Sequence, residues 1–148
     1  MKHLRLYCLF VIACFTHSSH ALDLNGVWVG FYGYGNSNEI VECAMVIEQE
    51  GTHLKGRMIE RQTFGKEPSV GLSANLTGMA GSASGDQKFV VFEKTYDGSG
   101  GQTHSVKYTL SLEQNDVLVG LWTLNQGQLT GKVMFRRVTT DILADLYR

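Results

Sequence analysis

Residues 103–114 read THSVKYTLSLEQ, and apolar and polar side chains alternate along this stretch one by one. One side of it carries His104, Val106, Tyr108, Leu110 and Leu112. A period of two residues is typical of a β-strand. An apolar face opposite a polar face indicates an antiparallel sheet that covers a core with one side only.

Similar strands recur along the chain, and each ends at a turn rich in glycine or asparagine. The pattern predicts eight of them, over residues 25–34, 39–49, 52–61, 70–79, 87–96, 103–114, 117–124 and 128–137. Short turns favour a meander, and closing the meander into a barrel removes two exposed edges. We therefore expect an all-β protein, an eight-stranded antiparallel up-and-down barrel. A two-sheet sandwich would need several long connections, and only residues 62–69 could supply one.

The two ends of this barrel carry further features. In the first strand Val27, Val29 and Phe31 make the second face apolar as well. This predicts that the outside of the strand is covered, either by a C-terminal segment or by another subunit. Residues 139–147 are expected to form that segment, as a short helix.

The N-terminus has the pattern of an export signal. Lys2 and Arg5 precede an apolar run over residues 6–15, which is too short to span a bilayer of ~30 Å as a helix. Small residues Ser19 and Ala21 follow at the spacing of a cleavage site. We expect residues 1–21 to be a signal peptide and residues 22–148 to be one barrel domain, exported to the periplasm or secreted.

A lipoprotein signal is the alternative reading of the same segment. It would place a lipid on Cys14, which would then be the protein's only contact with a membrane. In either case the mature chain loses Lys2 and Arg5, which leaves 11 basic residues against 14 acidic ones, a net charge of −3. No basic patch remains to follow a phosphate backbone, so we expect no nucleic-acid partner.

Cys43 is the only cysteine after residue 21, so the mature chain cannot form an internal disulfide. Its apolar neighbours, Met45 among them, favour a buried and inert thiol. An intermolecular disulfide or a reactive thiol remains open.

Motifs that carry catalysis or bind metals are missing from the sequence. It has no nucleophile elbow, no phosphate-binding loop and no paired cysteines. His53 and His104 fall on different strands, without a second ligand at useful spacing. Carboxylates that could pair for acid–base catalysis are Glu60, Asp86, Glu93 and Asp97. Nothing resembling an oxyanion site accompanies them, so we expect no enzyme, no metal and no cofactor.

One charged side chain must nevertheless enter the barrel. Glu93 and Lys94 are neighbours on one strand, so their side chains point to opposite faces. The one that points inward would form an ion pair or a hydrogen-bond network with Tyr96 or Tyr108. Alternatively, it would anchor the headgroup of a ligand.

The first and last strands carry a family resemblance. The start, Asn25-Gly26-Val27-Trp28, and the end, Phe135-Arg136-Arg137, resemble the calycin superfamily of lipocalins, fatty-acid-binding proteins and avidins. The resemblance implies a small exported bacterial lipocalin-like barrel, with Trp28 on its closed floor and an arginine packed across the indole. Gly26 and Trp28 would fill the first role. Arg137 would fill the second, with Arg136 as its rival.

A barrel of this kind suggests a ligand pocket with apolar walls and a few polar groups. The expected lining is Trp28, Tyr32, Met45, Met58, Glu60, Tyr108 and Trp122. We predict a non-catalytic barrel that binds a small apolar or amphipathic molecule. The alternative is an interior filled by its own side chains. The barrel would then bind a protein through its loops, as a periplasmic protease inhibitor or an envelope interaction module.

Overall fold

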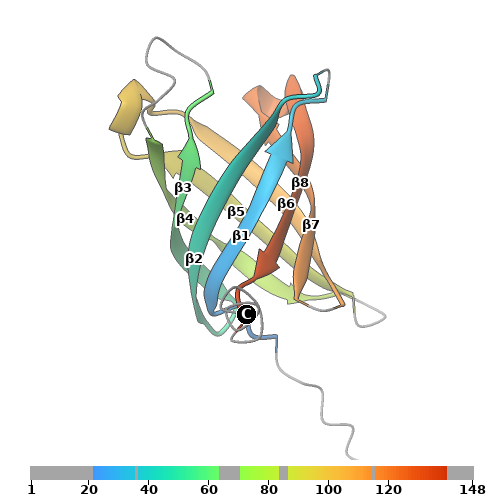
Figure 1. Ribbon diagram of the computed structural model, residues 1–148. Coiled ribbons are helices and arrows are strands. Elements are labelled where there is room, and N and C mark those ends of the chain that lie inside the picture. The colour runs from blue at the N-terminus through green and yellow to red at the C-terminus, as the bar shows by residue number, and fades with distance from the viewer. Residues whose placement is uncertain (1–21, 36, 64–70, 84–86, 115, 140–148) are drawn as a thin grey trace, which may run out of the picture.

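The computed structural model describes residues 22–35, 37–63, 71–83, 87–114 and 116–139, and these form a closed barrel (Figure 1). The strands are β1 (Gly26–Gly33), β2 (Ile40–Glu50), β3 (His53–Arg61), β4 (Gly71–Ser82), β5 (Lys88–Tyr96), β6 (Ser105–Glu113), β7 (Val117–Leu124) and β8 (Leu129–Arg137). Two single 3₁₀ turns, η1 (Ser99–Gly101) and η2 (Asn125–Gly127), lie in the loops after β5 and β7. The expected C-terminal helix lies outside the described residues.

Every strand pairs with its neighbours in sequence, and β1 also pairs with β8. Trp28 on β1 is therefore opposite Met45 on one side and Arg137 on the other. The prediction of an eight-stranded antiparallel meander barrel is confirmed. The largest change in a boundary is in β4, which continues to Ser82 because Ala80 still pairs with Val90.

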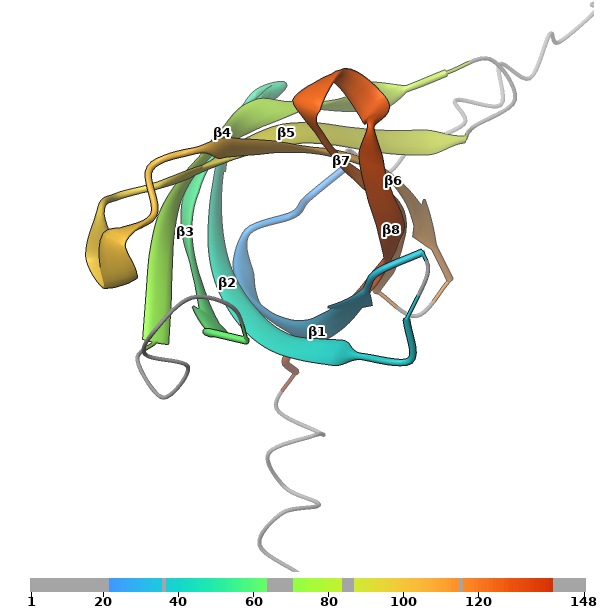
Figure 2. The same cartoon turned by 90° about the horizontal axis from the view of Figure 1, so that it is seen from above.

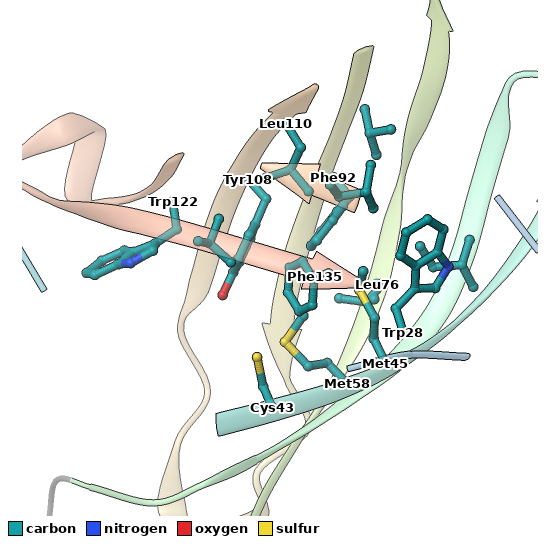
Figure 3. Packing of buried hydrophobic residues seen from close by; sticks show 14 of the residues in the cluster. Trp28, Cys43, Met45, Met58, Leu76, Phe92, Tyr108, Leu110, Trp122 and Phe135 are labelled. Atoms are coloured by element: carbon teal, nitrogen blue, oxygen red, sulfur yellow. The ribbon is translucent and has the colours of Figure 1, made fainter. Parts of the chain in front are cut away.

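Side chains that point inward fill much of the barrel, as Figure 3 shows. Alternation places Val106, Tyr108 and Leu110 of β6 inside, with at most 6% of each exposed. Trp28 and Phe135 are fully buried. The apolar side of the alternating pattern is thus the core side.

Two glycines on the inner face allow the strands to coil closely. A Cβ on Gly30 would lie 2.0 Å from the carbonyl oxygen of Met134, and one on Gly120 would lie 2.1 Å from that of Thr109. No side chain fits such a gap, so the bend of the sheet at these positions requires glycine.

The chain closes one end of the barrel with the segment before β1. The indole Nε1 of Trp28 donates a hydrogen bond to the carbonyl of Leu24 at 3.0 Å. The Arg137 guanidinium lies 4.6 Å from the centre of the Trp28 ring and donates to the carbonyls of Asp23 and Asn25. Arg136 points outward and is exposed. The structure thus places Arg137, rather than Arg136, across the indole at this closed floor.

The outer face of β1 is not covered within the described part of the chain. Val27, Val29 and Phe31 are 44%, 44% and 41% exposed. The expected cover would have to come from outside the described residues.

No helix in the described part of the chain is long and apolar enough to cross a membrane.

Arg137→Met should destabilise the fold more than Arg136→Met on the same strand. The first substitution removes a cation–π contact worth about 0.5–2 kcal/mol and two hydrogen bonds to the floor. We expect the free energy of unfolding to fall by about 2 kcal/mol or more in urea titrations. The exposed control should change it by less than about 0.5 kcal/mol. Equal losses in both variants would show that Arg137 does not hold the floor.

Candidate functional site

A cavity of about 530 Å³ lies at the end of the barrel opposite the floor. Figure 2 looks down on this end, where the loops after β1 and β7 and the turn η1 after β5 lie. Inward-facing residues near the ends of β1, β5, β6 and β7 line the cavity, together with residues of these loops. The interior is therefore filled at the floor and hollow at the mouth.

The base of this pocket holds a buried ion pair. The Lys94 ammonium lies 2.8 Å from a carboxylate oxygen of Glu60, and the two residues are 1% and 6% exposed. The same ammonium donates to the Tyr96 hydroxyl at 2.8 Å, and that hydroxyl donates to the other oxygen of Glu60. Strands β3 and β5 supply the three side chains, and β4 lies between these strands.

Aromatic faces surround the ammonium. Its nitrogen lies 4.3 Å from the ring centre of Tyr96, 5.4 Å from that of Tyr32 and 5.7 Å from that of Tyr108. Electron-rich ring faces attract a cation, and this helps to offset its lost hydration. Burial lowers the pKa of Lys94, while the charge of Glu60 acts in the opposite direction.

The tyrosines remain protonated over the whole physiological range. Burial, and then the negative charge of Glu60, raise the pKa of Tyr32, Tyr96 and Tyr108 far above the ordinary value for tyrosine. Their hydroxyl groups can therefore act as hydrogen-bond donors as well as acceptors.

An aromatic wall lines the pocket on the side of β1 and β7. The rings of Tyr32, Tyr34 and Trp122 meet edge to face, with their centres 5.3–5.9 Å apart. The indole Nε1 of Trp122 donates to the carbonyl of Gly33 at 3.0 Å, so the polar atom of the indole is already used. Leu124 and Leu129 extend this apolar wall to the rim.

Polar side chains also line the mouth of the pocket, next to β5 and β6. His104 packs against Tyr96 with ring centres 4.7 Å apart. Burial, and then the charge of Lys94, lower the pKa of His104, which favours the neutral imidazole. Gln102, Thr63 and Glu39 also line the pocket.

Some of the residues that the sequence predicted for the site line the pocket, and others lie in the filled half of the barrel. Tyr32, Tyr108 and Trp122 line the pocket, and Glu60 lies beneath it, bound to Lys94. Trp28, Met45 and Met58 face inward but belong to the filled half, with at most 1% of each exposed. The three are paired across β1, β2 and β3 at one level near the floor.

Several lining residues were missing from the predicted lining. Lys94 and Tyr96 were expected only as members of an inward ion pair or hydrogen-bond network, which they form with Glu60. His104 lies on the apolar side of the alternating pattern and was not assigned to the pocket. Tyr34 and Leu129 lie at the strand ends, where the alternating pattern stops.

Paired carboxylates for acid–base chemistry are not brought together in the described residues. Glu93 is on the outer face of β5, opposite Lys107. Asp97 is held outside the barrel by Ser73 and Arg57. Hydrogen bonds from Ser73 and Ser99 lower the pKa of Asp97. Asp86 lies outside the described residues.

The described residues give little support for a metal site or for a reactive thiol at Cys43. Within the described ranges no group of three or more His, Cys, Asp or Glu side chains could hold a metal ion. Cys43 is buried, and its burial together with Glu60 raises the pKa of the thiol to about 12. At neutral pH this thiol stays protonated and unreactive.

No protein-family model and no curated protein sequence matches this chain. The closed eight-stranded barrel is compatible with a calycin-like fold.

Removing one partner of the buried ion pair should cost far more than removing both. Lys94→Met leaves the buried carboxylate of Glu60 without its cation. Glu60→Gln leaves the buried ammonium of Lys94 without its anion. We expect each single variant to lose about 3–5 kcal/mol of unfolding free energy in denaturant titrations, and the double variant to recover most of that loss.

The exposed pair Glu93 and Lys107, which face each other across β5 and β6, provides the matched control. Glu93→Gln and Lys107→Met should each change stability by less than about 1 kcal/mol. Losses at Lys94 and Glu60 that simply add in the double variant would rule out a coupled pair.

Proposed function

We propose that this chain is an exported carrier or sensor that binds a small amphipathic molecule in the pocket at the open end of the barrel. The observation that carries this proposal is the cavity of about 530 Å³, with an aromatic wall and a polar base. Pockets for small ligands typically enclose about 300–1,000 Å³ and combine apolar walls with a few placed polar groups. The signal-like segment over residues 1–21 supports the export part of the proposal.

The charges and protonation states of the polar groups in the pocket favour a binding protein over an enzyme. Lys94 and Glu60 neutralise each other. The buried tyrosines keep their protons at neutral pH. These tyrosines are therefore not poised to give or take a proton near pH 7, as a general acid or base would be. The calycin-like barrel, the floor tryptophan and its arginine fit a lipocalin-like carrier in the same way.

Filling the pocket should abolish binding. Val106 of β6 lines the pocket and is 6% exposed, so Val106→Trp would occupy ligand space. We expect the wild-type protein to bind the uncharged fluorescent probe N-phenyl-1-naphthylamine saturably, and Val106→Trp to weaken that binding at least about tenfold. The measurement is a fluorescence titration at pH 7.5.

Thr109→Trp is the control, because Thr109 is on the same strand but faces solvent. It adds the same indole outside the barrel and should leave the dissociation constant unchanged. Absence of saturable binding to the wild type, or equal binding by both variants, would contradict a pocket ligand.

A protein-binding role is the second candidate, and the outer face of β1 favours it. Exposed apolar side chains continue across the neighbouring strands by register: Val27 faces Val46, Val29 shares a row with Ile59, and Phe31 faces Met134. A contiguous exposed apolar patch often marks an interface.

A photocrosslinking residue at position 29 tests this role in envelope extracts. We expect specific protein adducts at position 29 and none at position 109, which is on the outer face of β6. The same background at both positions would argue against this interface.

A further inference from the structure

The charges at the base of the pocket are already balanced before any ligand enters. Lys94 is the one lysine or arginine among the described lining residues, and the carboxylate of Glu60 lies 2.8 Å from it. Burial and the charge of Lys94 lower the pKa of His104, the next basic group, which favours its uncharged form. A ligand therefore meets a base with strong local dipoles and no net charge.

Hydrogen-bonding capacity nevertheless remains at this base. An ammonium group has three N–H donors. Within the described chain two acceptors are present for Lys94, namely Glu60 and Tyr96. An oxygen atom of a ligand can accept from the third donor, because Lys94 lines the pocket. Tyr32 and Tyr108 line the same space.

A ligand headgroup of either charge, negative or positive, would disturb the charge balance between Lys94 and Glu60. A carboxylate bound to the Lys94 ammonium would compete with Glu60 and leave one negative charge unpaired in a buried site. An ammonium headgroup would meet the positive charge of Lys94 directly. An alcohol, ketone or amide accepts the same hydrogen bond and adds no charge.

We infer that the pocket selects ligands whose buried polar group is uncharged, and that Glu60 is the residue that sets this selectivity. This inference rests on the proposed function, because it names the ligand class of the same pocket. Glu60 acts through Lys94, so it is a positioning residue and is not expected to touch the ligand.

Three probes with one body and different headgroups test the inference: octan-1-ol, octanoate and octylammonium. Their dissociation constants follow from displacement of N-phenyl-1-naphthylamine from the wild-type protein at pH 7.5. We expect octan-1-ol to bind at least about tenfold more tightly than either charged probe.

Glu60→Gln tests the role of the carboxylate. This variant keeps the shape of the side chain and leaves Lys94 without its counterion, so that octanoate can take the place of Glu60. We expect the preference to shift toward octanoate by at least about tenfold relative to octan-1-ol. A stability defect alone would weaken all probes alike. Glu93→Gln, on the outer face of the same region of β5, should retain the wild-type order of the probes.

The outcomes separate the two proposals. Octanoate binding as tightly as octan-1-ol to the wild type would overturn the inference and leave the proposed function standing. An unchanged order of probes in folded Glu60→Gln would overturn the role of Glu60. If Glu60→Gln does not fold, the wild-type order decides. If neither the fluorescent probe nor any octyl probe binds, the proposed function fails, and the inference fails with it.

Discussion

The hydrogen-bonded pairing of β1 with β8 is the constraint on which the rest of the structure depends. It turns a meander into a closed surface with one inside, so alternation along every strand becomes a choice between core and solvent. The same pairing places Trp28 beside Arg137 and lets the segment before β1 fold across the floor. Because one end is closed, the cavity lies at the other end.

A buried ion pair is a costly way to fill space inside such a barrel. Apolar side chains of the same volume often stabilise a core equally well or better. Here β3 and β5 place Glu60 and Lys94 at the boundary between the filled half and the hollow half. That position suits a pair that shapes recognition better than one that only supports the fold.

Much of the architecture followed from the two-residue period, because that period is a local property of each strand. It predicted the eight strands, the inward face of β6, and an inward charge at Glu93 or Lys94. The depth of a residue in the barrel depends on strand tilt and register, which no single strand encodes. For this reason Trp28, Met45 and Met58 were expected in the pocket but lie near the floor.

The inward glycines also limit how this barrel can change over time. At Gly30 and Gly120 the neighbouring backbone leaves no room for even a methyl group, so these positions cannot be used to reshape the interior. Variation that alters the size of the pocket must then come from the residues that line it, such as Val106 in the wall and Tyr34, Leu124 and Leu129 at the rim. Descendants of this chain could acquire new ligands by changing loops and strand ends while the lower half stays fixed.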